Sequence, residues 1–332
     1  MRDYFLPKNA FRTIFFIGKG GVGKTTTSAA VATYLSTKGY KTLIVSLDPA
    51  HNLGDVFMVE LGDKPKKIVE NLYGMELDME KVIRSYLKHL EESMKYMYRY
   101  LTVINLEKYF EVLSYSPGIE EYATLEAIRD ILKKGDKWDI IIFDTPPTGL
   151  TLRVLALPKI AKIWSEKLIE IRRKILDKRL TVEKIQGERK FVIEGKEYTL
   201  PSREEEDEVL KELLNYKDEV EEVLTIITDR DRTSVAAVIT PEMLALYETE
   251  RAKDSLFKLN IPLNLLVVNK VINLNVEPPQ LKVRMETQKE VLRKISEKFK
   301  GMDIIYLRTY EKEPRGLDML NTIGELIVKQ RW

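Results

Sequence analysis

Cysteine is absent from all 332 residues of this sequence. Iron–sulfur clusters, soft-metal thiolate sites and Cys-x-x-Cys zinc clamps all need sulfur ligands. We therefore expect neither zinc nor an iron–sulfur cluster, and no thiol-based sensing of a metalloid.

Net charge is also nearly absent, because 54 Lys and Arg residues balance 52 Asp and Glu residues to leave +2. A nucleic-acid partner would call for a strongly basic chain or a clustered basic surface. The balance therefore predicts no nucleic-acid partner.

Long apolar runs are missing as well. Typical of the longest are the four-residue runs Ile140 to Phe143 and Leu265 to Val268, whereas a helix that spans a bilayer needs about 20 apolar residues. The first residues also lack the apolar core of a secretory signal. The chain is therefore expected to be cytoplasmic. Its length of 332 residues predicts one elaborated domain or two.

A glycine-rich loop is the most informative feature that is present. It follows the apolar run 13–17 and precedes a helical pattern over 27–34, which gives a strand, a loop and a helix with the spacing G-x-x-x-x-G-K-T. Glycines let backbone N–H groups converge on phosphate oxygens, and the helix adds the positive end of its dipole. The spacing predicts that Lys24 reaches the terminal phosphates and that the Thr25 hydroxyl binds Mg²⁺. The predicted ATP contacts in this loop are Gly20, Gly21, Val22, Gly23, Lys24, Thr25 and Thr26.

A second lysine, Lys19, stands in the same loop. An ordinary phosphate loop does not need it, so it is either a solvated loop lysine or part of a more specific device. With Lys24 it reproduces the deviant loop K-G-G-x-G-K-T-T of dimerising ATPases, and the loop is similar to those of MinD, ParA and the nitrogenase iron protein. In that class the first lysine crosses to the partner's phosphates, which makes Lys19 and Lys24 candidate catalytic residues.

Polar residues follow the predicted strand 41–47 and open with Asp48. The carboxyl ends of parallel strands face the ligand crevice of an open sheet. Asp48 could orient the water that attacks the terminal phosphate, and Asn52 could bond the phosphate or that water. Taken alone, the segment is equally typical of a turn.

Two further strand ends carry candidate ligands. The run 138–143 ends in Asp144, which could hold the water shell of Mg²⁺, as Asp48 could. The run 263–268 ends in Asn269, whose amide both donates and accepts and could read the adenine edge. A purely structural turn is the alternative at both positions.

Together these residues resemble the arsenite-pump and guided-entry ATPase family, whose eukaryotic members deliver tail-anchored membrane proteins. The segment from Asp48 to Asp55 is similar to the first switch of that family, and Asp144 to Gly149 is similar to the second. Further matching segments are 116–121, 241–251 and 315–317. The resemblance implies that Asp48 orients water, that Asn52 contacts phosphate and that Asn269 reads adenine.

The sequence also departs from that family. The targeting members have a zinc-binding cysteine pair soon after the position of Asn269, and this sequence has none. The arsenite pump proper is a tandem of two ATPase halves, whereas this sequence has one nucleotide loop. Lys19 would therefore need a second copy of the chain, and a two-fold homodimer is expected.

The expected fold is α/β, with a doubly wound, mostly parallel sheet in one P-loop ATPase domain over residues 1–332. Two helical insertions are expected, at about 58–132 and about 153–230, the second with a β-hairpin around residues 191–200. Each carries an apolar helix face that could hold a client or could simply be core. The first runs from Met79 to Leu101, and the second comprises Ile160, Ile163, Trp164, Leu168, Ile171 and Ile175.

The sequence thus predicts an Mg-ATP-dependent homodimeric ATPase that captures a hydrophobic transmembrane helix and works with a membrane receptor. One alternative is the ATPase subunit of an anion or metalloid pump without thiol sensing. Another is a membrane-positioning switch similar to MinD that uses the C-terminal helical pattern from Leu317 to Ile327.

Overall fold

The structure is a computed structural model that describes residues 2–49, 52–97, 113, 116–187, 190–193, 196–272 and 282–329. The chain divides into two compact units. Unit 1 comprises residues 1–79, 127–155 and 226–332, and unit 2 comprises residues 80–126 and 156–225. The predicted insertion bounds enclose both segments of unit 2, but their role as insertions stays a prediction.

Unit 1 is built on an eight-stranded sheet in the order β10-β9-β8-β1-β5-β2-β4-β3. Neighbouring strands are parallel, except that β3 runs antiparallel to β4. The central strands are apolar and buried on both faces, as parallel strands covered by helices must be. The strands are β1 (Arg12–Gly18), β2 (Thr42–Ser46), β3 (Lys66–Val69), β4 (Leu72–Glu76), β5 (Ile140–Asp144), β8 (Thr233–Ile239), β9 (Leu263–Val271) and β10 (Asp303–Arg308).

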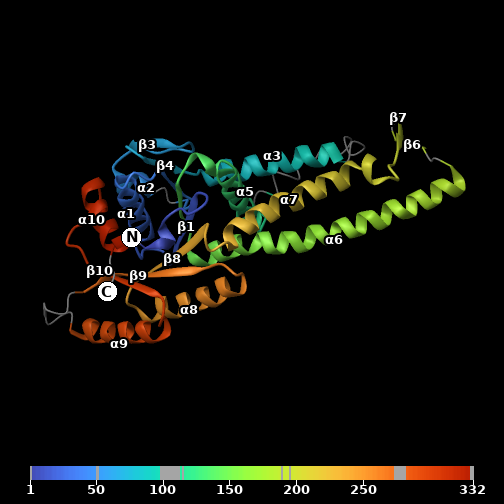
Figure 1. Cartoon of the computed structure of the whole chain (residues 1–332). Coiled ribbons are helices and arrows are strands. Elements are labelled where there is room, and N and C mark those ends of the chain that lie inside the picture. The colour runs from blue at the N-terminus through green and yellow to red at the C-terminus, as the bar shows by residue number, and fades with distance from the viewer. Residues whose placement is uncertain are drawn as a thin grey trace. The chain divides into compact units, whose positions relative to one another are not determined.

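Helices cover both faces of this sheet. In Figure 1, α1 (Lys24–Thr37) and α10 (Leu317–Lys329) lie on one face, and α8 (Met243–Lys258) and α9 (Lys282–Lys298) lie on the other. Two short elements precede β1 and β5, η1 (Asp3–Phe5) and η3 (Gly135–Lys137), and α2 (Leu53–Phe57) follows β2. The prediction of a doubly wound, mostly parallel α/β fold is confirmed.

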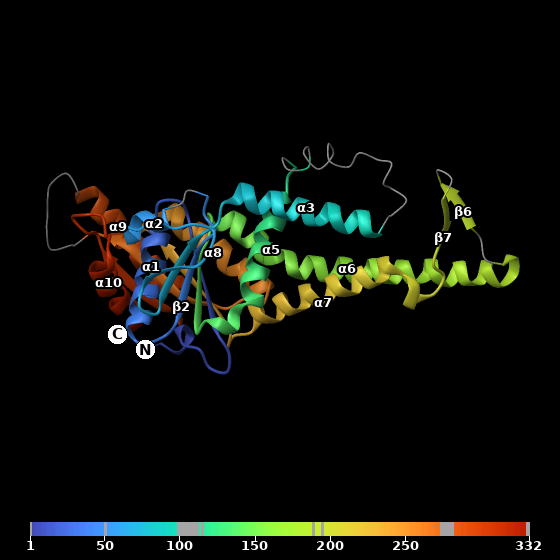
Figure 2. The same ribbon diagram turned by 90° about the horizontal axis from the view of Figure 1, so that it is seen from above.

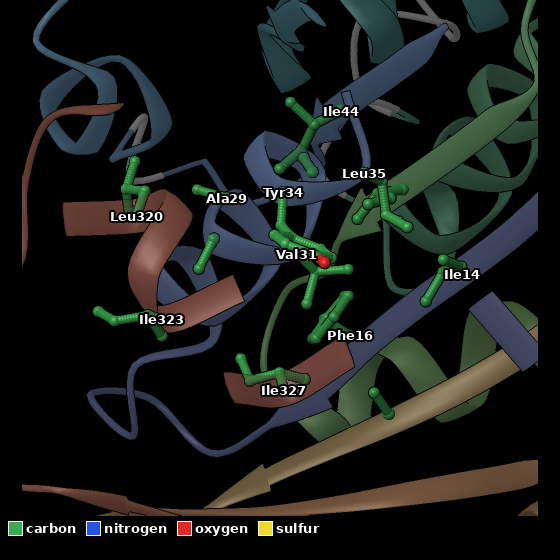
Figure 3. Close-up of a cluster of buried hydrophobic side chains, with 14 of the residues drawn as sticks. Ile14, Phe16, Ala29, Val31, Tyr34, Leu35, Ile44, Leu320, Ile323 and Ile327 are labelled. Carbon is green, nitrogen blue, oxygen red and sulfur yellow. The ribbon is translucent and has the colours of Figure 1, made fainter. Parts of the chain in front are cut away.

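The main core of unit 1 lies between the sheet and the α1–α10 pair (Figure 3). Phe16 of β1, Tyr34 of α1 and Ile327 of α10 are all at most 1% exposed. The apolar side of α10, which the membrane-positioning alternative would place in a lipid surface, is thus packed into the core through Leu320, Ile323 and Ile327.

Four helices run through or into unit 2: α3 (Met79–Met97), α5 (Ile119–Lys133), α6 (Thr148–Gln186) and α7 (Glu208–Thr228). Figure 2 shows α6 and α7 side by side. The Arg172 guanidinium of α6 donates two hydrogen bonds, of 3.0 and 2.7 Å, to the buried Asp207 carboxylate just before α7. Where the hairpin was predicted, β6 (Lys190–Ile193) pairs antiparallel with β7 (Lys196–Thr199), and η4 (Glu204–Glu206) follows them.

The two apolar faces predicted in the insertions differ in exposure. On α3, Met79 and Leu87 are buried, the other apolar side chains up to Met94 are half-buried, and Tyr86 stacks on Tyr122 of α5. The part of that face beyond residue 97 lies outside the described residues. The face on α6 is exposed along its whole predicted length.

Helix α6 therefore carries two apolar faces within unit 2. One contains Ile169 and Leu176, which pack against Leu210 of α7. The other, here called the α6 stripe, extends beyond the predicted set and comprises Ile160, Ile163, Trp164, Leu168, Ile171, Ile175, Val182 and Ile185. None of the described helices combines the length and apolarity needed to cross a bilayer.

Gly324 sets how closely α10 approaches α1, and this can be tested. A Cβ at this position would lie 2.0 Å from the Ala30 carbonyl oxygen and 2.6 Å from the Tyr34 Cβ. Gly324→Ala is therefore expected to lower the free energy of unfolding by about 1–3 kcal/mol, because overpacking exceeds the gain in helix propensity. Urea unfolding measures the difference.

Gly149→Ala is the matched control, because Gly149 also lies in a helix but has nothing within 4 Å of its built Cβ. It should leave stability unchanged or raise it. Equal stability of Gly324→Ala and the native chain would contradict the packing argument.

Candidate functional site

The glycine-rich loop lies between β1 and α1, as predicted. Gly21 and Gly23 have φ of +78° and +93°, which residues with a Cβ adopt only at a cost. Gly23 is also crowded, because a Cβ there would lie 2.4 Å from the Asn269 side-chain nitrogen. Lys24 begins α1 with its side chain only 5% exposed.

A cavity of about 530 Å³ opens beside this loop within unit 1. Its wall includes most of the predicted nucleotide contacts, namely Gly20, Gly21, Gly23, Lys24, Thr25, Thr26, Asp48, Asn52 and Asn269. Predicted residues that do not line it are Lys19, Val22 and Asp144. Residues 50 and 51 of the first switch lie outside the described part of the chain.

A further part of the wall comes from the end of β10 and the segment after it, to which the sequence analysis assigned no role in the site. Arg308, Thr309, Tyr310, Lys312 and Arg315 line it. The apolar residues Ile304, Ile305 and Leu307 could have predicted a strand here, but only its parallel pairing with β9 shows that its carboxyl end reaches the same edge of the sheet.

Asp144, at the end of β5, has a fully buried carboxylate. The Thr25 hydroxyl donates to its Oδ2 at 2.7 Å. Its Oδ1 is buried with no hydrogen-bond partner among the described residues. Burial raises the pKa of Asp144 to about 6, although the nearby Lys24 ammonium and the Thr25 hydrogen bond lower it.

These two residues fit a hydrated Mg²⁺. A hydroxyl and a carboxylate with one unused buried oxygen provide the hard oxygen ligands that this ion prefers, and Mg²⁺ usually keeps several waters. No group of three or more His, Asp or Glu side chains among the described residues is arranged to hold a metal directly.

Asp48 lies close to Lys24. Its Oδ2 is 3.9 Å from the Lys24 Nζ, and its side chain is 19% exposed. It also contributes to the raised pKa of Asp144, as does Glu76. The structure therefore brings Lys24, Thr25, Asp48 and Asp144 together at one edge of the sheet.

Asn52 precedes the short helix α2, and its side chain makes no capping bond to that helix. The N–H groups of Leu53 and Gly54 donate instead to Oε1 of Glu76, at 2.8 and 3.0 Å. Glu76 ends β4 and is 8% exposed. The sequence analysis missed Glu76, although it too follows an apolar strand.

Lys19 and Asn269 occupy different surroundings. The Lys19 Nζ is 3.8 Å from the Glu248 carboxylate of α8, and its side chain is half-exposed. The Asn269 amide donates to the Val22 carbonyl oxygen at 2.9 Å, so it contacts the loop directly. Strand β9 continues to Val271, so Asn269 lies within it and not after it, because pairing with β10 resumes at Arg308.

Comparison with known proteins gives consistent similarities. The sequence model of the "Anion-transporting ATPase" family matches residues 11–329. The chain is 33% identical to ATPase ASNA1 homolog 1 of Paramecium tetraurelia, over 98% of this chain and 95% of that protein. It is 31% identical to ATPase get3 of Pyrenophora tritici-repentis, over 98% and 93%. It is 32% identical to a candidate arsenical pump-driving ATPase of Aquifex aeolicus, over 95% and 99%.

The raised pKa of Asp144 predicts a pH effect on stability in the absence of nucleotide and metal. The folded chain holds this proton more tightly than the unfolded chain, so the contribution is complete below pH 4 and is lost as pH rises to about 6. The loss is on the order of 3 kcal/mol. Urea unfolding across this range should show a component that Asp144→Asn lacks.

Other carboxylates also titrate in this range, so the difference between the two proteins is the quantity to compare. Parallel pH profiles for the native chain and Asp144→Asn would contradict the assignment.

Proposed function

Because the chain belongs to the anion-transporting ATPase family and is an ATP hydrolase, we propose that it binds Mg-ATP in the cavity beside the glycine-rich loop and uses hydrolysis to capture and release tail-anchored membrane proteins. The family match and the relatives named ATPase ASNA1 homolog and ATPase get3 support the activity. The exposed α6 stripe is the observation that carries the client-binding part. The predicted membrane receptor and cytoplasmic location stay predictions.

The proposed chemistry follows from the positions of the side chains. The N–H groups of the loop and the Lys24 ammonium hold the phosphates, and Asp48, close to Lys24, orients the attacking water. Thr25 and Asp144 would hold Mg²⁺, with Asp144 and Asp48 acting through water, and the ion would supply positive charge at the terminal phosphates. Asn52 bonds the phosphate, and its amide is available because Glu76 caps α2.

A homodimer would complete the site. Lys19 is on the loop but outside the wall of the cavity, half-exposed beside Glu248. An exposed cation at that place suits a phosphate on a second copy of the chain, and a two-fold contact would give each site one Lys19. This is the arrangement that the resemblance to the deviant-loop ATPases implies.

The α6 stripe suits a hydrophobic helix as client. Its members recur mostly at three- and four-residue steps, with one seven-residue step between Ile175 and Val182, and Ile163, Trp164 and Ile185 are 61%, 64% and 74% exposed. From residue 160 to 185 a helix rises about 38 Å, which exceeds the hydrocarbon thickness of about 30 Å that a transmembrane helix must span. An exposed apolar surface of this length would be costly without a ligand.

A pump-associated ATPase is the second candidate, favoured by the similarity to the Aquifex aeolicus protein. Stimulation of hydrolysis by oxyanions would distinguish it from the targeting function. The chain has no cysteine, so any such stimulation would not act through thiols.

Asp48→Asn tests the proposed chemistry. The variant should hydrolyse ATP about 100-fold more slowly or worse, because it loses the group that orients water, and should still bind ATP. In Mg-ATP, light scattering should give the mass of two chains. Turnover at the native rate would remove Asp48 from this role, and a single-chain mass with ATP bound would contradict the homodimer.

Ile171→Glu tests the client surface. In an Asp48→Asn background, co-expression with a tagged protein that ends in one transmembrane helix should yield a soluble complex, and Ile171→Glu should reduce its amount about tenfold or more, because it buries a charge in the contact. Lys184→Glu is the control, since Lys184 is exposed on the same helix and, at about 100° per residue, lies about 140° around the helix from the centre of the stripe.

Equal capture by Ile171→Glu and Lys184→Glu would contradict a role for the stripe. Failure of the Asp48→Asn protein to capture any client, with ATP bound, would shift the function to the pump candidate.

A further inference from the structure

Two consecutive residues of β9 hold two consecutive carbonyl groups of the glycine-rich loop. The Asn269 side chain donates to the Val22 carbonyl at 2.9 Å, and the Lys270 Nζ donates to the Gly21 carbonyl at 2.7 Å. Both belong to unit 1 and line the cavity. A bond of this length from an ammonium group is among the stronger protein hydrogen bonds.

Neighbouring residues of a regular strand point to opposite faces of the sheet, so this pair needs an irregular backbone. The pairing of β9 with β10 shows this irregularity. Val268 is opposite Tyr306 and Val271 is opposite Arg308, so β9 has two residues between these pairs where β10 has one. Such a bulge redirects side chains and is common beside active sites. Here it lets Asn269 and Lys270 reach the same loop.

The redirection carries a conformational cost. Lys270 has φ of +58°, in the left-handed region that disfavours residues with a Cβ. Among the described non-glycine residues with positive φ, Asn71 and Asn260 are of the type that tolerates it. The other two are Lys270 and Met58. Met58 follows α2 as its C-cap residue, and Asp55 and Val56 of that helix line the same cavity. Strained residues of this kind cluster at functional sites.

We propose that Lys270 is a positioning residue for nucleotide binding, which fixes the glycine-rich loop in its phosphate-binding shape by holding the Gly21 carbonyl. A loop that binds an anion must turn its N–H groups toward the anion, so donors that engage its carbonyl groups favour that shape before ligand arrives. The proposal rests on the nucleotide site proposed above. It goes beyond that site because Lys270 acts through the loop and not on the phosphates.

The test is titration of the full-length protein with a fluorescent ATP analogue and Mg²⁺, together with steady-state hydrolysis. Lys270→Asn keeps a side chain that tolerates positive φ but removes the ammonium. It should raise the Kd of the analogue about five- to tenfold and leave kcat at saturation within about twofold. Lys270→Gly should raise the Kd equally and leave the melting temperature unchanged or higher, because it removes the strain.

Lys312→Asn is the charge control, since Lys312 is an exposed lysine of the cavity wall on another segment. Lys312→Asn measures how much affinity for the analogue is lost when one positive charge is removed from the cavity wall. Lys270→Asn should lose more affinity than this, and the difference should be clearer at high salt, where distant charges are screened. Lys270→Arg should recover most of the affinity. In the nucleotide-free protein, amide hydrogen exchange in residues 19–23 should be faster in Lys270→Asn than in the native chain.

Lys24→Ala separates failure of the site from failure of the proposal. If Lys24→Ala binds the analogue normally, the nucleotide site itself is misplaced and the proposal falls with it. Lys24→Ala could instead abolish binding while Lys270→Asn binds the analogue with the Kd of the native chain or of Lys312→Asn. That result would support the nucleotide site and overturn the role of Lys270. A lower melting temperature in Lys270→Gly with unchanged affinity would make Lys270 a structural residue only.

Discussion

The parallel arrangement of β1, β2, β5, β9 and β10 is the constraint on which the candidate site depends. Parallel strands end at the same edge of a sheet, so the residues after them are brought together whatever their separation in the sequence. Thr25 and Asp144, 119 residues apart, form a 2.7 Å hydrogen bond there, and Lys270 reaches Gly21 across 249 residues. These contacts require the strand order, and the strand order requires apolar strands buried under helices on both faces.

Much of this could be predicted from the sequence because strand ends are local signals. The apolar run ending in Asp144 and the loop before Lys24 each carry their chemistry within a few residues. Glu76 and Lys270 act across the fold, and their neighbours in the sequence do not show which groups they contact. Glu76 caps α2 from another strand, and Lys270 depends on a bulge that is defined only by pairing with β10. Long-range pairing is the information that periodicity does not contain.

Helix α6 shows a second limit of pattern analysis. Its apolar residues fall on two faces, one with Ile169 and Leu176 and the other with Ile163 and Ile171. Hydrophobic spacing identifies both faces but does not say which is covered, because burial depends on what packs there. The sequence offered the faces of both α3 and α6 as client surfaces, yet the described apolar side chains of α3 are largely packed, and α6 has the exposed stripe.

The Asp144 carboxylate connects the proposed metal site, a bound proton and the glycine-rich loop. In the ligand-free chain its burial favours a proton, and the Thr25 hydroxyl donates to it. A cation beside the same oxygens would favour the ionised form, so a proton and Mg²⁺ compete for one buried group. Thr25 belongs to the first turn of α1, directly after the glycine-rich loop that Asn269 and Lys270 also contact. A change in the protonation of Asp144 should therefore affect that loop through Thr25. Nucleotide affinity should therefore depend on magnesium and on pH through the same carboxylate.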